Sequence, residues 1–256
     1  MRFFSRVILF ALKTILPFYY IGAKRANGMA SLSFKHGAVF ETRLNSQDAF
    51  VLNEIWKYHC YDEAEIAPED VVVDIGAHIG GYTVLASKKG ATVYAYEPEP
   101  GNYRLLKRNT AINRCKKAKL YNLAVSSRKG AITLNVDAKG SGLHSLYQLS
   151  SASRRATVLA VPLHEVITAN KLKSIQVLKI DAEGAEYGIL LPASRSDLKK
   201  IRTIILEYHD YIDHGHNKKQ LELILRDSGF KVHDIAPWYQ HFFMKSGTLI
   251  AKRSSG

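Results

Sequence analysis

Five side chains that follow two apolar runs of this 256-residue chain are the ones best suited to acid–base chemistry. Asp181, Glu183 and Glu186 follow the first run, and Glu207 and His209 end the second. Carboxylates packed together repel one another, which raises the pKa of at least one of them toward the range of a general base. Histidine has the intrinsic pKa closest to neutrality. We therefore expect Asp181, Glu183 and His209 to be catalytic and Glu207 to bind substrate.

Each of these residues also has a structural explanation, and the sequence leaves it open. Asp181 can cap the helix that follows, while Glu183 and Glu186, one helical turn apart, can complement its dipole. We favour the structural explanation for Glu186, and a lone histidine such as His209 is often structural. The histidines and aspartates at positions 209–216 suggest a metal, but they show no fixed ligand spacing, so no metal is expected.

A glycine-containing loop, Asp74-Ile-Gly-Ala-His-Ile-Gly80, joins an apolar run to a helical segment. In open α/β sheets such loops bind nucleotides beyond the carboxyl ends of the strands. A dinucleotide site needs a glycine where this chain has His78, because the pyrophosphate approaches the backbone there. Asp74 would also repel a pyrophosphate, whereas a carboxylate attracts the ammonium and sulfonium groups of S-adenosylmethionine. The loop therefore favours S-adenosylmethionine over a dinucleotide.

Glu97 ends the next apolar run, 17 residues after Gly80. A carboxylate at this place can accept hydrogen bonds from both ribose hydroxyls of a nucleotide. Taken alone, Asp74 is explained as well by helix capping, and Glu97 by a surface acid beside a turn. Their order and spacing together favour a cofactor site.

The elements that must position these residues alternate between strands and helices from residue 71 onward. We expect strands at 71–75, 91–96, 120–125, 132–136, 157–161, 175–180, 201–206, 231–235 and 242–251, and helices at 82–89, 102–113, 163–170 and 218–228. In the second helix, Leu105, Leu106 and Ile112 are expected to face inward. This alternation predicts an α/β fold with a mostly parallel sheet, helices on both faces and an antiparallel closing pair.

A turn near residue 68 predicts two parts, an N-terminal extension over 1–67 and an α/β domain over 68–256. The extension is expected to hold a hairpin around His36-Gly37 and a helix at 49–58. Residues 7–21 are mostly apolar but too short and interrupted to span a membrane. A helix packed on the domain, a helix lying on a membrane surface and, with least support, a cleaved signal remain open.

The net charge of +13 is concentrated in two segments. Residues 101–160 carry twelve basic residues and one acid, and residues 1–30 carry five basic residues and no acid. Such a field favours an anionic partner, although a solvated basic surface explains it as well. With two cysteines, Cys60 and Cys115, the chain has no disulfide framework and reads as cytoplasmic, with membrane contact through residues 1–25 left open.

Several segments together resemble the FkbM-type methyltransferases over about residues 48–252. The segments are the loop 74–80, Tyr94-Ala-Tyr-Glu-Pro98, Asn109 and Asn113, Ala124-Val-Ser126, Lys179-Ile-Asp-Ala-Glu-Gly-Ala-Glu186 and Leu206-Glu-Tyr-His209. The block at 179–186 is the most specific of them, and Tyr58–Tyr61 is similar to the tyrosine-containing entry segment of the family. The chain departs from the family after Ser126, where an acid is common and Ser127 stands here.

The resemblance implies a class I, Rossmann-like, three-layer methyltransferase that uses S-adenosylmethionine and usually methylates oxygen in sugars or lipid-linked metabolites. The residues expected at the cofactor are Asp74, Gly76, Ala77, His78, Gly80, Tyr82, Thr83, Glu97, Pro98, Ala124 and Asp181.

The loop at 139–153 is long and poor in apolar residues, as binding loops often are. We expect His144, Arg154 and Arg155 to contact a small anionic acceptor such as a sugar or glycolipid. Two alternatives stay open. One is an RNA methyltransferase that uses residues 101–160, and the other is a non-catalytic, membrane-associated binding protein that docks through residues 1–25.

Overall fold

The computed structural model describes residues 22–26, 28–34, 36–137, 153–210, 215–236 and 246–253, with only the backbone at 22–26, 136–137 and 153–154. The apolar segment at 7–21 and His144 therefore lie outside the described residues. None of the helices in the described part of the chain is long and apolar enough to cross a membrane.

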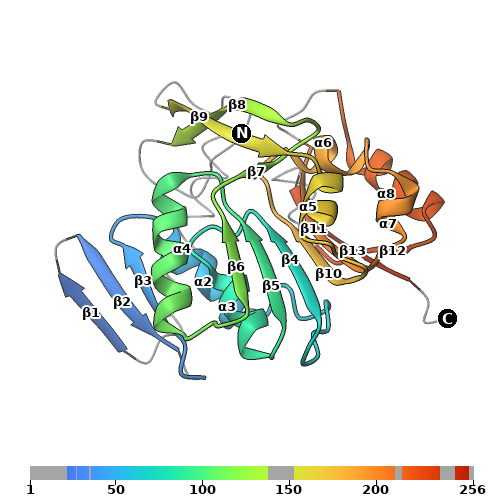
Figure 1. Ribbon diagram of the computed structural model, residues 1–256. Coiled ribbons are helices and arrows are strands. Elements are labelled where there is room, and N and C mark those ends of the chain that lie inside the picture. The colour runs from blue at the N-terminus through green and yellow to red at the C-terminus, as the bar shows by residue number, and fades with distance from the viewer. Residues whose placement is uncertain are drawn as a thin grey trace.

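A seven-stranded sheet forms the centre of the molecule, in the order β12-β13-β11-β10-β4-β5-β6 (Figure 1). Only β13 runs antiparallel to its neighbours, which confirms the predicted mostly parallel sheet. The chain passes from β4 outward through β5 and β6, then returns to β10 on the other side of β4. This places the switch point, where ligands bind in such sheets, between β4 and β10. The strands are β4 (Val71–Ile75), β5 (Thr92–Tyr96), β6 (Ala118–Tyr121), β10 (Ile175–Ile180), β11 (Ile201–His209), β12 (Lys231–Asp234) and β13 (Ser246–Lys252).

Helices cover both faces of the sheet, and each face has its own hydrophobic cluster. Val72 and Val73 are both fully buried and belong to opposite clusters, which explains why β4 is an uninterrupted apolar run. One face carries α2 (Asp48–Trp56), α3 (Gly81–Lys88) and α4 (Pro100–Ile112), and the other carries α5 (Leu163–Ala169), α6 (Glu186–Leu190), α7 (Arg195–Leu198) and α8 (Lys218–Asp227).

The N-terminal part forms a second sheet, shown in blue in Figure 1, from β1 (Gly22–Ala26), β2 (Met29–Ser33) and β3 (Val39–Arg43). The predicted hairpin and the helix that follows it are confirmed as β2–β3 and α2. The rings of Phe34 and Phe40 pack edge to face at 5.7 Å, and Phe40 meets Trp56 of α2 at 5.6 Å. Val72 and Ile79 belong to the same cluster, so this sheet and α2 share a core with the central sheet.

A third sheet, in the order β7-β9-β8, comprises β7 (Ala124–Val125), β8 (Gly130–Asp137) and β9 (Ser153–Val161). The predicted antiparallel pair is confirmed as β8 and β9. The prediction of one strand at 120–125 is wrong, because the chain leaves the central sheet at Asn122. The Asn122 amide donates to the carbonyls of Glu97 and Pro98 at 2.8 and 3.0 Å and turns the chain into β7.

Helix α4 buries Leu105 and Leu106 as predicted, but Ile112 is 42% exposed, so its predicted inward position is wrong. Two asparagines, instead of apolar residues, face the N-terminal sheet at this end of the helix. Asn109 Oδ1 accepts from the Glu41 N–H at 2.7 Å, and Asn113 Oδ1 accepts from the Val39 N–H at 3.0 Å. These amides satisfy the edge of β3 and attach it to α4.

Candidate active site

The loop between β4 and α3, residues 76–80, is called the glycine loop below. Gly76 has φ +75°, and a Cβ on it would stand 1.8 Å from the Asp181 carbonyl oxygen. The backbone N–H groups of Gly76 and Ala77 both donate to the Tyr96 carbonyl at 3.0 Å. Glycine is therefore required at position 76 because the ends of β4 and β10 approach so closely there.

The other end of the glycine loop also has left-handed backbone. Gly80 is the N-cap of α3 with φ +95°, and a Cβ on it would lie 2.9 Å from Leu106 Cδ1. His78 has φ +51°, a conformation that costs an ordinary residue about 1 kcal/mol. The loop keeps this shape because its neighbours hold it.

Asp74 is fully buried at the end of β4. Its Oδ2 accepts from the Thr83 hydroxyl at 2.6 Å, and the Lys179 ammonium lies 3.3 Å from its Oδ1. Among the described residues, His78 Nδ1 and the Tyr82 hydroxyl are buried without a hydrogen-bond partner. Polar atoms left open in this way around the glycine loop fit a polar ligand.

Lys179 of β10 is a buried cation that sequence reasoning gave no role. Its ammonium donates to the Gly76 carbonyl at 2.8 Å and to the Ile75 carbonyl at 3.4 Å, and it lies 3.7 Å from Asp181 Oδ2. Burial alone would lower the pKa of Lys179, but Asp74 and Asp181 outweigh it and raise that pKa. A lysine inside an otherwise apolar strand was the signal that could have revealed this role.

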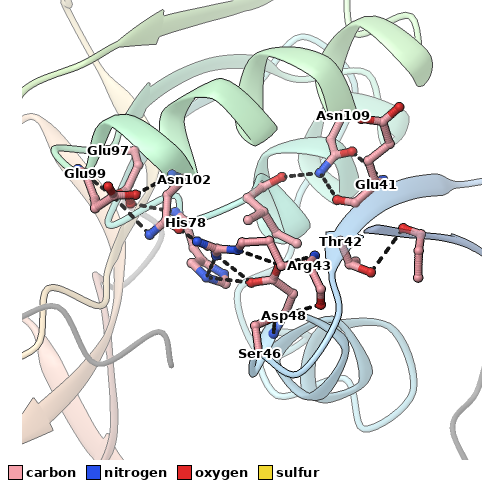
Figure 2. A network of polar contacts seen from close by, with 12 residues as sticks. Glu41, Thr42, Arg43, Ser46, Asp48, His78, Glu97, Glu99, Asn102 and Asn109 are labelled. Carbon is pink, nitrogen blue, oxygen red and sulfur yellow. Dashed lines mark hydrogen bonds and ion pairs between the residues drawn. The ribbon is translucent and has the colours of Figure 1, made fainter. Parts of the chain in front are cut away.

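Glu97 is buried at the end of β5, and backbone groups hold its carboxylate (Figure 2). Oε2 accepts from the His78 N–H at 2.8 Å, and Oε1 accepts from the Glu99 N–H at 2.9 Å. Burial raises the pKa of Glu97 against the opposing effect of His78 and these hydrogen bonds. The carboxylate is thus fixed in orientation beside the glycine loop.

At the carboxyl ends of β10 and β11 lies a group of residues called here the acidic mouth: Asp181 and Glu183, which follow β10, and Glu207 and His209, the last part of β11. One ligand atom from each of Asp181, Glu183 and His209 lies within 4.8 Å of the other two. His209 Nε2 stands 3.6 Å from Glu183 Oε2 and 3.7 Å from Glu207 Oε1. The structure therefore brings together all three residues predicted to be catalytic.

The second ring nitrogen of His209, Nδ1, contacts the Glu186 carboxylate. The two side chains are almost completely buried, with His209 Nδ1 3.1 Å from Glu186 Oε1. Burial would lower the pKa of His209, but Glu186 and Glu183 outweigh it and raise that pKa well above its usual value. The raised pKa favours the imidazolium form of His209, which leaves the carboxylates around it as the candidate proton acceptors.

Glu183 stands in a loop with φ +48°, and α6 begins only at Glu186, so the prediction that Glu183 opens a helix is wrong. The Glu186 carboxylate accepts from the N–H groups of Ala182 and Gly184 at 2.9–3.1 Å, which closes the loop before the helix starts. A structural role through the helix dipole was favoured for Glu186 from the sequence, and the structure shows a different structural role, the closing of the loop by these hydrogen bonds.

Several acidic side chains lie close together in the acidic mouth. Burial, and then Asp181, raise the pKa of Glu207, while burial raises that of Glu183 against the lowering effect of His209. Glu54 of α2, which sequence reasoning missed, joins them: burial, Asp181 and Glu183 raise its pKa to about 8. Tyr61 is also buried there and donates to Asp181 Oδ2 at 3.3 Å.

The other residues predicted to bind substrate or cofactor differ in how exposed they are. Glu207 keeps 36% of its side chain exposed in the acidic mouth, and Arg155 is exposed on β9. The side chain of Arg154 and all of His144 lie outside the described residues. Ala77, Tyr82, Thr83 and Ala124 are buried, and Pro98 is half-buried.

Two carboxylates and an imidazole at this spacing are also a donor set that a divalent cation accepts. Asp181, Glu183 and His209 are the residues that would hold it; ligand bonds of about 2.1 Å would require their donor atoms, which lie within 4.8 Å of one another, to move closer together. The acidic mouth therefore offers two kinds of chemistry, proton transfer and cation binding.

A glycine loop after β4, an acid at the end of β5 and a switch point between β4 and β10 define a class I methyltransferase fold. Residues 74–232 match the family described as the Methyltransferase FkbM domain. The chain belongs to this family, and it is an S-adenosylmethionine-dependent methyltransferase.

Similar proteins agree with this assignment. The 31-O-demethyl-FK506 methyltransferase FkbM of Streptomyces tacrolimicus is 29% identical over 236 residues, which cover 79% of this chain and 89% of that protein. Methyltransferase sdnD of Sordaria araneosa is 27% identical over 222 residues, covering 74% and 85%. A tRNA (guanine(37)-N(1))-methyltransferase of Ciona intestinalis is 31% identical over 96 residues, covering only 38% of this chain and 20% of that protein.

Solved structures share the fold at low sequence identity. A SAM-dependent methyltransferase from Agrobacterium tumefaciens superposes with a TM-score of 0.51 at 10% identity, covering 90% of this chain and 71% of that one. A putative rRNA-methylase from Clostridium thermocellum gives the same TM-score and identity, covering 80% and 98%.

Proposed function

We propose that this methyltransferase methylates a hydroxyl oxygen of a small-molecule acceptor and that Glu183 accepts the hydroxyl proton. The observation that carries the proposal is the convergence of Asp181, Glu183 and His209 within 4.8 Å at the carboxyl ends of β10 and β11. The glycine loop touches the same place, because Gly76 lies against the Asp181 carbonyl. A cofactor in the loop and an acceptor in the mouth would therefore be neighbours.

When bound, S-adenosylmethionine supplies a methyl group already activated on a sulfonium, so the protein need only align the acceptor and remove its proton. Glu97 would hold the ribose, and Asp74 and the backbone of the glycine loop would line the rest of the cofactor site. The buried polar atoms beside the loop that have no hydrogen-bond partner, His78 Nδ1 and the Tyr82 hydroxyl, are the support for this fit.

The choice of Glu183 as base follows from its surroundings. Glu186 and Glu183 raise the pKa of His209, which favours its protonated form, and Asp181 is compensated by the Tyr61 hydroxyl and the Lys179 ammonium. Glu183 has a raised pKa, which makes its carboxylate a stronger proton acceptor than an ordinary glutamate. Asp181 is assigned to positioning at the boundary between cofactor and acceptor.

The acceptor itself is proposed from the charge of the mouth and from the relatives. Four acidic side chains, including Glu54, surround the reacting position, and even with the raised pKa values of Glu54, Glu183 and Glu207 they disfavour an anionic group there. Any anionic group of the acceptor would lie farther out. The name of the Streptomyces relative refers to an O-demethylated compound, which supports oxygen as the methylated atom.

The test is formation of S-adenosylhomocysteine with pooled hydroxylated acceptors, such as glycans, glycolipids and polyketide-like alcohols. We expect Glu183→Gln to lower kcat by about 10²-fold or more, the usual effect of losing a general base, with little change in cofactor affinity. Glu165→Gln is the matched control, because Glu165 on α5 forms an ion pair with exposed Lys129 and is no member of the acidic mouth. Unchanged kcat in Glu183→Gln would remove the base assignment.

An RNA acceptor is the second candidate, on one specific observation. The segment from α4 to the start of β6 exposes seven basic side chains and no acid of its own, although Arg108 and Lys117 pair with Glu41 and Glu69: Arg104, Lys107, Arg108, Arg114, Lys116, Lys117 and Lys119. The partial match to tRNA methyltransferases supports it further. Binding of tRNA that weakens steeply with salt, with methyl transfer to it, would favour this candidate over a small molecule.

A further inference from the structure

A closed ring of polar contacts joins the N-terminal sheet to the glycine loop (Figure 2). Its members are Arg43 at the end of β3, Asp48 at the start of α2, His78 in the loop, Glu97 after β5 and Asn102 of α4. Two of the five, Arg43 and Asp48, lie outside residues 74–232, the part of the chain that matches the family.

Arg43 and Asp48 form the strongest contact of the ring. Arg43 donates through Nε to Asp48 Oδ2 at 3.0 Å and through an Nη atom to Oδ1 at 2.6 Å, and its backbone N–H donates to Oδ2 at 2.8 Å. Asp48 is fully buried. Burial would raise the pKa of Asp48, but hydrogen bonds from His78 and Arg43 outweigh it and hold that pKa well below its usual value.

The remaining contacts close the ring around Glu97. Asp48 Oδ1 stands 3.3 Å from His78 Nε2, and Arg43 donates to Asn102 Oδ1 at 2.7 Å. The His78 backbone N–H donates to Glu97 Oε2 at 2.8 Å, and the Asn102 amide reaches Glu97 Oε1 at 3.4 Å. The ring therefore holds two of the three donors to the Glu97 carboxylate, one on the glycine loop and one on α4, and the Glu99 N–H is the third.

We propose that Arg43 and Asp48 are positioning residues that hold His78 and Asn102 so that Glu97 is presented to the cofactor ribose. His78 has left-handed backbone, and its side chain is tied to Asp48 rather than to its own loop. Without that tie the His78 N–H no longer has a fixed direction, and neither does the carboxylate it supports. The N-terminal sheet and α2 are thereby part of the cofactor site. The inference rests on the proposed role of Glu97 at the ribose.

The same contacts would also exist if the ring only stabilised the fold, and a coupling experiment separates the two roles. The measured quantity is the dissociation constant of S-adenosylhomocysteine and of its 2′-deoxy analogue, by titration calorimetry. A ribose hydroxyl donating to a carboxylate is worth about tenfold or more in affinity, so the wild-type protein should bind the deoxy analogue that much more weakly. A purely structural role would leave this ratio unchanged.

Two variants, Asp48→Asn and Arg43→Lys, break contacts of the ring, and a third, Glu41→Gln, is the control. Asp48→Asn places a donor where Arg43 and His78 need an acceptor, and Arg43→Lys keeps the charge but cannot reach Asp48 and Asn102 together. Glu41→Gln breaks the exposed contact between Glu41 and Arg108, 3.2 Å, which also joins β3 to α4 but touches no ring member. Thermal unfolding of each variant shows whether it is folded at the temperature of the titration.

We expect Asp48→Asn and Arg43→Lys to bind S-adenosylhomocysteine about tenfold more weakly, and their penalty for the deoxy analogue to fall to about threefold or less. Glu41→Gln should match the wild type for both ligands. If folded Arg43→Lys keeps the full wild-type ratio, Arg43 and Asp48 do not position Glu97 and the inference is wrong. If the wild type binds both ligands equally, the ribose role of Glu97 fails first and the inference fails with it.

Discussion

The carbonyl oxygen of Asp181 stands 1.8 Å from the position that a Cβ on Gly76 would occupy. The Asp181 N–H in turn donates to the Ile75 carbonyl at 3.1 Å, so the ends of β4 and β10 are in direct backbone contact. This contact joins the glycine loop, where the cofactor is proposed to bind, to the acidic mouth, where the acceptor is proposed to bind. A single missing side chain thus sets the distance between the two halves of the site.

Gly76→Ala should disrupt the site much more than a comparable substitution elsewhere. The new Cβ would meet backbone, which cannot move as a side chain can, and φ is +75°. We expect loss of more than about 3 kcal/mol of unfolding free energy, or loss of cofactor binding where the strands separate. Gly37→Ala is the control, because Gly37 has φ +69° but nothing lies within 4 Å of a Cβ placed on it. This variant should lose about 1 kcal/mol of unfolding free energy. Equal effects in urea unfolding would show that the contact with Asp181 is unimportant.

Lys179→Met should be strongly destabilising because it leaves a buried carboxylate without its cation. The carboxylate is Asp74, whose side chain is 0% solvent-accessible and lies 3.3 Å from the Lys179 ammonium, so water cannot replace the lost cation. Removing one partner of a buried ion pair costs about 3–5 kcal/mol. The double variant Lys179→Met/Asp74→Asn should recover part of that free energy, because no charge is then left buried.

The exposed pair Lys117–Glu69 provides the control for this prediction. Lys117→Met should change the unfolding free energy by less than about 1 kcal/mol, as exposed ion pairs contribute little. Both measurements use chemical denaturation. A Lys179→Met variant as stable as Lys117→Met would mean that Asp74 is compensated by Thr83 alone.

The central strands were predictable because burial on both faces dictates their composition. The apolar runs 71–75 and 175–180 coincide with β4 and β10 in both bounds. The same logic placed Asp74, Glu97 and the Asp181–Glu183 pair at one edge of the sheet, since parallel strands end together. The resemblance to the FkbM family then singled out the same residues.

What the sequence did not reveal depends on contacts between distant segments. Arg43 and Asp48 lie in a part of the chain with no motif, and their role follows only from their distance to His78, 35 and 30 positions later. Ile112 looked like a core position because it follows the helical spacing of Leu105. It is exposed because α4 ends there and asparagines occupy the face toward β3.

Turnover should rise with pH through a value above the usual pKa of a glutamate. Burial raises the pKa of Glu183, so its carboxylate, the proton-accepting form, becomes populated only as the pH passes that raised value. His209 opposes this shift because its positive charge favours the carboxylate. His209→Asn should therefore move the acidic limb of the kcat profile to higher pH. A limb that moves to lower pH, or one that stays in place, would contradict the pairing of His209 with Glu183.

Chelation decides between the two kinds of chemistry that the acidic mouth offers. Proton transfer by Glu183 requires no cation, so we expect kcat to stay within about twofold when excess EDTA is added and when Mg²⁺ or Mn²⁺ is then restored. Asp181, Glu183 and His209 could also act together as cation ligands, and the His209→Asn variant separates that role from proton transfer.

If His209 is a cation ligand, its loss weakens metal affinity, and added metal restores turnover. Loss of a charge beside the base shifts the pH profile and is insensitive to metal. If EDTA abolishes turnover and Mg²⁺ restores it, the raised pKa of Glu183 reflects a cation site, and activation of the acceptor hydroxyl passes to the bound metal.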